Sequence, residues 1–224
     1  MIDYNFINEK IKGKTLRFDI GLSFNMPNAI KWLNDDANVY VIGIEPHPRN
    51  FESCCSLLEN HHAGDRCYLI ETAIDYVDGS PDSKFYGLKG DSGTSSLCKP
   101  IGRFENLVDR TYTVETTSLG NILDNLEYDR IDVLKTDTQG RDLNVLKSAR
   151  EHLKNVDFIY AEYDESADYE GANTGEELDS YLYYMGFECY DRIFVPERNN
   201  KLVDCEYRNL HSTSDKQGPR WNSN

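Results

Sequence analysis

Short runs rich in Val, Ile, Leu and Tyr alternate along this chain with longer stretches in which apolar residues recur at helical spacing. This alternation favours a parallel sheet with helices on both faces, because consecutive parallel strands need a crossover connection that is usually a helix. The strand candidates are almost continuously apolar, which is typical of strands covered on both sides. We therefore expect an α/β fold with a doubly wound, mostly parallel sheet of Rossmann-like type. The expected strands are LRFDIG (16–21), VYVIGIE (39–45), RCYLIETAI (66–74), IDVLKTD (131–137) and DFIYAEYD (157–164), and the expected helices are NMPNAIKWLNDD (25–36), PRNFESCCSLLENHH (48–62), RDLNVLKSAREHLKN (141–155) and TGEELDSYLYYMG (174–186).

Two parts of the chain depart from the alternation. Residues 76–117 are rich in Gly, Ser, Asp and Lys and predict an irregular insertion with one short hairpin. An insertion of this length is either a surface excursion or a lid or wall for a substrate, and the sequence leaves both open. Residues 186–210 predict an antiparallel C-terminal strand pair with a turn near Asn199 and Asn200, and the polar residues 211–224 are expected to be loosely held. The length suits a single domain over residues 1–224.

The charge of the chain argues against several classes of partner. Lys and Arg number 24 and Asp and Glu number 39, which gives a net charge of −15. A field of that sign repels phosphate backbones and anionic lipid. No apolar run approaches the ~20 residues that cross a bilayer, and the N-terminus lacks the pattern of a secretory signal. We expect a soluble cytoplasmic protein that binds neither nucleic acid nor membranes; its oligomeric state stays open. The six cysteines have no zinc-ligand spacing, so reduced thiols are expected.

The ends of the predicted strands are the places to look for a ligand, because in open α/β sheets ligands bind outside the carboxyl ends of the strands. The first strand carries Asp19 and is followed by Gly21, Ser23 and Asn25 before the next helix. A glycine there lets the backbone approach a ligand closely, and free N–H groups at a helix start attract a carboxylate. These residues are candidates for binding the charged end of a cofactor; the alternative is an ordinary strand-to-helix turn.

The second strand ends in an acidic residue, Glu45, ~26 residues after the first strand's aspartate, a spacing at which a carboxylate accepts hydrogen bonds from ribose hydroxyls. Pro46 and His47 follow and end the strand, and His47 either contacts an adenosine or, as is more common for a histidine in a turn, is simply solvated. The third strand ends near Ala73 and Asp75, where small residues and a carboxylate can accommodate an adenine ring. An ordinary strand end explains that third segment equally well.

The fourth and fifth strands deliver four charged residues to the same edge of the sheet. Lys135 and Asp137 lie two residues apart, so they point to one side of the strand and can face one ligand. Glu162 and Asp164 repeat that spacing on the fifth strand. The three acids can accept a proton, hold an ammonium group, or bind Mg²⁺ or Mn²⁺ through oxygen ligands. The alternative for Lys135 and Asp137 is a salt bridge that only holds the rim of the sheet.

Taken together, these strand ends resemble the FkbM-type family of S-adenosylmethionine (SAM)-dependent methyltransferases. The family pattern has an acidic, glycine-bearing first turn, an E-P-x-P after the second strand, a Ser-rich stretch before a T-L-D helix, and an I-D-x-x-K-x-D-x-x-G signature. The corresponding segments here are FDIGLSFN (18–25), GIEPHPRNF (43–51), SGTSSL (92–97), VETTSLGNIL (114–123) and RIDVLKTDTQGRDLNVLKSA (130–149). They occur in family order across residues 18–164.

The chain also departs from the family pattern at several positions. Leu22, Ser23 and Asn25 replace the usual small residues of the first turn, which implies that the methionine end of SAM is held differently. Residues 139 and 142 are Gln and Asp where the family usually has glutamates, and residue 120 is Gly where it usually has Asp. A catalytic assignment that rests on those glutamates does not transfer to this chain.

The resemblance implies transfer of the SAM methyl group to a hydroxyl, commonly on a carbohydrate or a polyketide, and a deoxyhexose such as rhamnose in a glycan is the expected acceptor. The chain is also similar in style to the sugar O-methyltransferases that chloroviruses use on capsid glycans, in which case the cytoplasm is that of the host. The expected roles are catalysis by Asp137 oriented by Lys135, a candidate Mg²⁺ or Mn²⁺ site drawn from Asp137, Glu162 and Asp164, and SAM binding by Asp19, Gly21, Ser23, Asn25, Glu45, Pro46, His47, Ala73 and Asp75. Tyr86 and Tyr112 of the insertion can stack on a sugar face, but amphipathic residues at the edge of the core are the more common role of such tyrosines.

Two other functions stay open at this point. A nicotinamide-dependent oxidoreductase also binds ribose through an acidic residue, but the glycines that a pyrophosphate requires are missing. A non-catalytic glycan-binding module on the same fold is compatible with the altered first turn.

Overall fold

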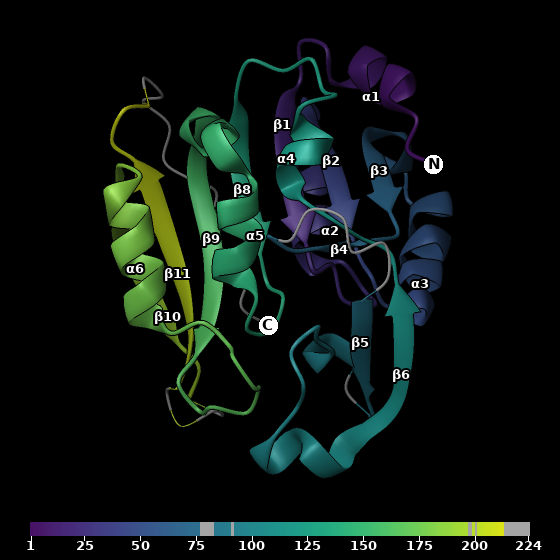
Figure 1. Cartoon of the computed structure of the whole chain (residues 1–224). Helices are drawn as coiled ribbons and strands as arrows, with labels where there is room; N and C mark the ends of the chain where they lie inside the picture. The colour runs from purple at the N-terminus through teal and green to yellow at the C-terminus, as the bar shows by residue number, and fades with distance from the viewer. Residues whose placement is uncertain (77–82, 91, 197–198, 200, 213–224) are drawn as a thin grey trace.

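The computed structural model describes residues 1–76, 83–90, 92–196, 199 and 201–212. Its centre is a seven-stranded sheet in the order β10-β11-β9-β8-β1-β2-β3 (Figure 1). The last strand, β11, runs antiparallel to both of its neighbours, and the other pairs from β9 to β3 are parallel. The expected α/β fold with an antiparallel C-terminal strand pair is therefore confirmed. The strands are β1 (Thr15–Ile20), β2 (Val39–Ile44), β3 (Cys67–Ile70), β8 (Ile131–Thr136), β9 (Val156–Asp164), β10 (Phe187–Phe194) and β11 (Leu202–Asn209).

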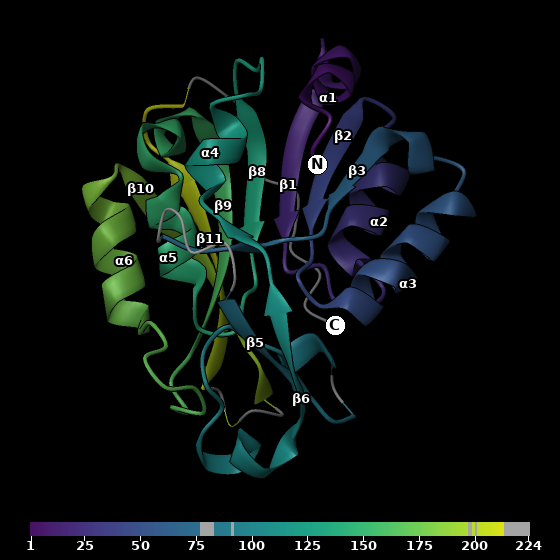
Figure 2. The same ribbon diagram turned by 45° about the vertical axis from the view of Figure 1, so that its right-hand side comes forward.

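Helices cover both faces of this sheet, as Figure 2 shows. On one face, α2 and α3 bury Trp32, Leu33 and Cys54 against alternate residues of β2, β8 and β9. On the other face, α1, α4, α5 and α6 pack on a larger apolar core that runs from β1 to β11. Pro27 and Pro48 begin α2 and α3, where the missing N–H of proline costs no hydrogen bond. The helices are α1 (Tyr4–Ile11), α2 (Pro27–Asp35), α3 (Pro48–Glu59), α4 (Leu119–Leu123), α5 (Asp142–Ser148) and α6 (Gly175–Tyr184).

Two predicted elements are shorter than the sequence pattern indicates. The expected strand over 66–74 breaks after β3, and Ala73–Ile74 forms β4, which pairs in parallel with β7 (Thr116–Thr117) in a separate small sheet. The physical reason is a change of partner: the amide of Ala73 donates to the carbonyl of Glu115 at 2.8 Å instead of continuing the ladder to β2. The expected helix over 141–155 likewise ends with α5, and Arg150–Asn155 continues as a 3-10 helix.

The insertion contains the predicted hairpin, formed by β5 (Ser83–Leu88) and β6 (Val108–Val114), which pair antiparallel. The hairpin lies beyond the carboxyl ends of β1 and β2 in both views (Figures 1 and 2). The turn predicted near Asn199 and Asn200 falls partly outside the described residues, and so does most of the C-terminal segment predicted to be loosely held. Within the described part of the chain, no helix is long and apolar enough to span a bilayer, and all six cysteines are free thiols.

The strand order reverses beside β1, which lies between β2 and β8. Crossovers from β1 and β2 pass over one face, whereas the chain that follows β8 passes over the other face. The loops after β1 and β8 therefore diverge, and they leave a crevice at the carboxyl ends of these strands, the usual position of a ligand in this class of fold.

The central strand β8 provides a test of this core. Leu134 is fully buried there, so replacement by Ala should lower the free energy of unfolding by ~2–5 kcal/mol through lost burial and a residual cavity. Urea denaturation followed by circular dichroism measures the change. The matched control is Leu107→Ala, because Leu107 is 41% exposed and should change stability by less than ~0.5 kcal/mol. Equal losses in the two variants would contradict this assignment of the core.

Candidate functional site

A cavity that opens to solvent lies at the carboxyl ends of β1, β2 and β8. It brings together Glu45 from the end of β2 and Asp137 from the end of β8, as the strand-end analysis predicts. The insertion supplies part of the wall, which supports its interpretation as a wall over that of a mere surface excursion. The lining residues are Ile20, Gly21, Ser23, Ile44, Glu45, Pro46, Thr72, Ala73, Ile74, Phe85, Gly93, Ser95, Leu97, Asp137, Thr138 and Arg141.

The ends of β1 and β8 touch through their backbones at Gly21. Gly21 has φ +81°, and a Cβ atom added there would lie 1.9 Å from the carbonyl oxygen of Asp137. The amide of Asp137 donates to the carbonyl of Ile20 at 3.0 Å, and the amide of Gly21 donates to the carbonyl of Ile44 at 2.9 Å. Only glycine satisfies both the left-handed conformation and the close approach. Gly21 thus allows the turn after β1 to pack directly against Asp137, the acidic residue at the end of β8.

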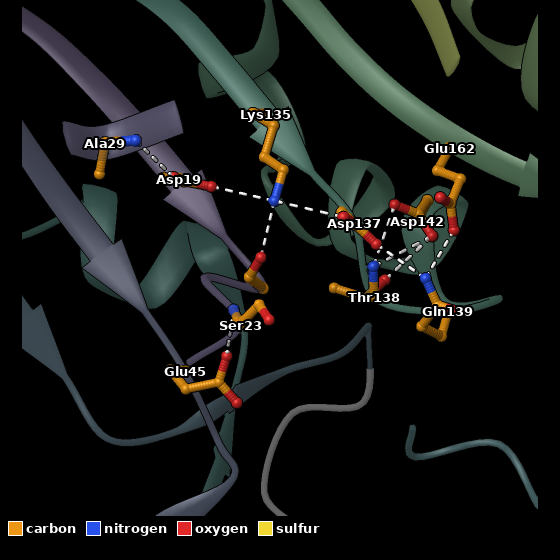
Figure 3. A network of polar contacts seen from close by, with 11 residues as sticks. Asp19, Ser23, Ala29, Glu45, Lys135, Asp137, Thr138, Gln139, Asp142 and Glu162 are labelled. Atoms are coloured by element: carbon orange, nitrogen blue, oxygen red, sulfur yellow. Dashed lines mark hydrogen bonds and ion pairs between the residues drawn. The ribbon is translucent and has the colours of Figure 1, made fainter. Parts of the chain in front are cut away.

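A buried ion pair lies immediately behind this contact (Figure 3). The Lys135 ammonium lies 3.0 Å from Asp19 Oδ1 and 3.6 Å from Asp137 Oδ2, and it donates to the carbonyl of Gly21 at 2.6 Å. Burial by itself lowers the pKa of Lys135, but Asp19 and Asp137 outweigh it and raise that pKa above its usual value. Asp19 also accepts from the amide of Ala29 at 3.0 Å, in the first turn of α2. Asp19 is fully buried and does not line the cavity, so it supports the turn from behind instead of facing a ligand.

Glu45 is held by two backbone amides at the edge of the cavity. Its Oε2 accepts from the amide of Ser23 at 3.0 Å and its Oε1 accepts from the amide of His47 at 2.9 Å. The residue is 4% exposed, and this burial raises the pKa of Glu45 to about 7 despite the two amides. Each carboxylate oxygen has two acceptor positions, so the group can still accept hydrogen bonds from ligand hydroxyls.

His47 is not solvated, contrary to the more common behaviour of a histidine in a turn. It is 5% exposed, and its ring packs edge-on against Tyr112 at 4.8 Å between centroids and against Phe85 at 6.1 Å. Its Nδ1 accepts from the amide of Asn50, which caps the start of α3. Neither Tyr112 nor Tyr86 lines the cavity, so the structure gives no support to sugar stacking on these rings, whereas Phe85 does line it.

The acid at the end of β8 belongs to a hydrogen-bonded group centred on Gln139 (Figure 3). The Nε2 of Gln139 donates to Asp137 at 2.9 Å and to Glu162 at 2.7 Å. Burial, followed by the charges of Asp137 and Asp204, raises the pKa of Glu162 well above its usual value. The side chain of Asp137 is 30% exposed and lines the cavity, so it is the acid of this group that a ligand can reach.

The predicted cluster of three acids does not form. Asp164 turns away, because its Oδ1 accepts from the amide of Ser166 at 2.7 Å and its Oδ2 lies 3.6 Å from Arg103. Among the described residues, no group of three or more His, Cys, Asp or Glu side chains is arranged to hold a metal ion. Asp137, Glu162 and Asp164 therefore do not make up a common ligand set in this structure.

The expected adenine wall is only partly in place. Ala73 lines the cavity, but the Asp75 carboxylate accepts from Arg141 at 2.6 Å and from Asn144 at 2.9 Å, and it does not line the cavity. Asn25 is exposed and also lies outside the lining, whereas Ser23 and Pro46 are part of it.

Several lining residues escape the sequence analysis. Phe85, Ser95 and Leu97 come from the insertion, which has no periodicity to indicate which side chains face inward. The one available signal is that Phe85 and Leu97 are isolated apolar residues in a polar segment. In the sequence, Arg141 is the first residue of the predicted helix over 141–155, and only the fold shows that it borders the cavity.

Comparisons with known proteins concern the family and the fold of the chain. The profile of the Methyltransferase FkbM domain matches residues 17–189. The 2-O-methyltransferase NoeI of Sinorhizobium fredii is 30% identical over 135 residues, which are 57% of this chain and 54% of that protein, so the match spans about half of the relative's length. TrmK of M. capricolum, solved with S-adenosylhomocysteine (SAH), superposes with a TM-score of 0.53 at 9% identity, over 97% of this chain and 73% of that chain. Fibrillarin of Aeropyrum pernix, solved with SAM, gives 0.51 at 11% identity, over 87% and 66%. At these identities the two structures show the shared fold alone.

The buried ion pair behind the turn can be tested by a double-mutant cycle. Lys135→Met should lower the free energy of unfolding by ~3–5 kcal/mol, because it leaves the buried Asp19 carboxylate without its cation. Adding Asp19→Asn should recover most of that loss, since the amide is neutral and can still accept from Ala29. Urea unfolding of the two single variants and the double variant measures the coupling. Additive losses in the double variant would contradict a direct interaction between the two side chains.

Proposed function

This chain belongs to the Methyltransferase FkbM domain family, and we propose that it transfers the methyl group of SAM to a hydroxyl of a neutral sugar, a deoxyhexose such as rhamnose within a glycan. The observation that carries the proposal is that Glu45 and Asp137 line one cavity at the point where the strand order reverses. We assign Glu45 to the binding of the nucleoside and Asp137 to the hydroxyl oxygen that reacts.

The cofactor half of the cavity lies at the ends of β1 and β2. Glu45, fixed by the amides of Ser23 and His47, accepts hydrogen bonds from the ribose hydroxyls. Gly21 lets the backbone approach closely, and the small residue Ala73, together with Pro46, borders the adenine. The likeness in fold to methyltransferases solved with SAM or SAH supports this assignment. When bound, SAM supplies a methyl group on a positively charged sulfur.

The acceptor half lies at the end of β8. Asp137 receives the proton of the acceptor hydroxyl, and Gln139 and Lys135 hold its carboxylate in place. A positioned base of this kind contributes typically ~10²–10⁴-fold to a rate. The cavity also holds the acceptor in line with the methyl group and excludes water, which lowers the entropic part of the barrier. Phe85 and Leu97 of the insertion pack with Ala73 and form an apolar part of the cavity wall. We further propose that residues 1–224 act as one methyltransferase domain.

Transfer to oxygen is favoured by the relative NoeI, a 2-O-methyltransferase. Nucleic acid as acceptor is disfavoured by the net charge of −15. A nicotinamide-dependent oxidoreductase is no longer a useful alternative, because the family is one of methyltransferases. Turnover of SAM would distinguish the proposed methyltransferase from a non-catalytic glycan-binding module on the same fold.

Replacement of Glu45 tests the ribose assignment. Glu45→Gln should weaken SAH binding at least ~10-fold at pH 8, because a buried amide cannot replace a carboxylate that accepts from two hydroxyls. The pKa of about 7 also predicts that the wild-type protein binds SAH about 10-fold more weakly at pH 6 than at pH 8, since the carboxylate becomes protonated as the pH falls through that value.

Isothermal titration calorimetry at the two pH values measures both effects. Glu45→Gln should remove most of the pH dependence, and Glu188→Gln, an exposed edge-strand control, should retain it. Equal SAH affinity in the wild-type protein and in Glu45→Gln would remove the ribose assignment.

Replacement of Asp137 tests the base. Asp137→Asn should reduce kcat by ~10²–10⁴ with p-nitrophenyl α-L-rhamnopyranoside as acceptor, because the amide cannot take the hydroxyl proton. SAH affinity, measured by calorimetry, should change by less than ~3-fold, because the carboxylate acts on the acceptor and not on the cofactor. Asp129→Asn, an exposed control that precedes β8 at the opposite end of the sheet, should behave as wild type. A large loss of SAH affinity with Asp137→Asn would reassign Asp137 to the cofactor's ammonium.

A further inference from the structure

Arg141 is the only cationic side chain among the described residues that line the cavity. Lys135 lies close by, but its side chain is 3% exposed and is engaged by Asp19. The side chain of Arg141 is 29% exposed and lines the cavity. The functions assigned above make no use of this group.

One end of the guanidinium is fixed and another part of it has no partner. Nη2 donates to Asp75 at 2.6 Å, and Asp75 is held in turn by Asn144 at 2.9 Å and is nearly buried. Nε is buried and has no hydrogen-bond partner among the described residues. Buried donors in native proteins are almost always paired, so this orphan N–H shows that the surrounding protein leaves the donors of the Arg141 guanidinium incompletely satisfied.

The turn between β8 and α5 places Arg141 on the same cavity as Asp137. Gln139 has φ +53° and Gly140 has φ +101°, so the chain reverses within four residues. A Cβ on Gly140 would lie 2.7 Å from the Cβ of Ala172, so glycine is required for this tight packing. Asp137 and Arg141 therefore line the same cavity from the two ends of one short turn.

We propose that Arg141 determines acceptor specificity by donating a hydrogen bond to the sugar oxygen adjacent to the hydroxyl that Asp137 deprotonates. The acceptor is then a neutral vicinal diol. Neutrality follows from the pairing with Asp75, which cancels the charge of the guanidinium and leaves its N–H groups as directional donors. This inference rests on the proposed methyl transfer to a sugar hydroxyl.

The test is a double cycle between enzyme and acceptor. The position methylated on p-nitrophenyl α-L-rhamnopyranoside is first identified by NMR, and kcat/KM is then compared with that of the analogue in which the adjacent hydroxyl is replaced by hydrogen. For the wild-type enzyme, the deoxy analogue should lose at least ~10-fold in kcat/KM, because a site built to donate to a hydroxyl rejects a molecule that lacks it. On the intact acceptor, the kcat/KM of Arg141→Met should be at least ~10-fold below that of the wild-type enzyme. Replacing the adjacent hydroxyl by hydrogen should then lower the kcat/KM of this variant by less than a further ~2-fold.

Two controls separate this role from a structural one. Arg130→Met removes another arginine that pairs with an aspartate, at the opposite end of β8, and should keep the full discrimination between the acceptors. SAH and 5′-methylthioadenosine, which lacks the amino-acid part, should each bind Arg141→Met as tightly as wild type. If Arg141→Met does not fold, Arg141→Lys keeps the charge beside Asp75 and loses the planar group, and it should show the same loss of discrimination.

Full discrimination retained in Arg141→Met would overturn the proposal. So would a loss of affinity for SAH with unchanged affinity for 5′-methylthioadenosine, because the arginine would then bind the cofactor's carboxylate. Failure of the wild-type enzyme to methylate any vicinal diol in a panel of neutral glycosides, while it still binds SAH, would contradict the proposed acceptor class itself and with it the role of Arg141.

Discussion

The site depends on one buried ion pair. Lys135 joins the two strands on which the crevice is built: it pairs with Asp19 on β1, donates to the carbonyl of Gly21, and lies close to Asp137 at the end of its own strand. An ammonium removed from water is costly unless acids and carbonyls surround it, so the pair fixes the relative positions of all three groups. Asp19 also fixes the position of the first turn of α2, because its carboxylate accepts a hydrogen bond from the amide of Ala29. The crevice is therefore set before any ligand enters, which is the condition that electrostatic catalysis requires.

Gln139 stands where the family resemblance of the sequence implies a glutamate. Its amide nitrogen donates to Asp137 and Glu162 simultaneously, while its oxygen faces the hydroxyl of Tyr169 at 3.5 Å. A third carboxylate here would add like charge to a group in which burial already raises the pKa of Glu162. A neutral donor instead joins the two acids and leaves Asp137 as the accessible one. Gln139 thus holds the Asp137 carboxylate in place without adding a charge to the group.

The sequence predicts the sheet and the strand ends well, because both depend on local pattern. Continuous apolar runs identify the buried strands, and an acid at the end of a parallel strand must lie at the same edge as its neighbours, which is why Glu45 and Asp137 meet. Contacts between distant segments leave no such pattern. The transfer of Ala73 to a second sheet depends on Glu115, the burial of His47 depends on the hairpin, and the engagement of Asp75 depends on Arg141. These partners are separated by tens of residues, and only tertiary structure brings them together.

The small sheet of β4 and β7 has a consequence for the evolution of this enzyme. Ala73 pairs with Thr116 and Ile74 with Thr117, so the chain departs for the insertion and returns from it at a single place. The segment in between is a loop closed at its base and held further along by backbone hydrogen bonds of Lys99 and Ile101 to Glu170 and Asp168, and the entropy of closing such a loop rises only with the logarithm of its length. Selection can lengthen, shorten or replace it at little cost to the parallel sheet. A lineage can therefore vary this wall of the cavity while the strand ends of the parallel sheet are inherited unchanged.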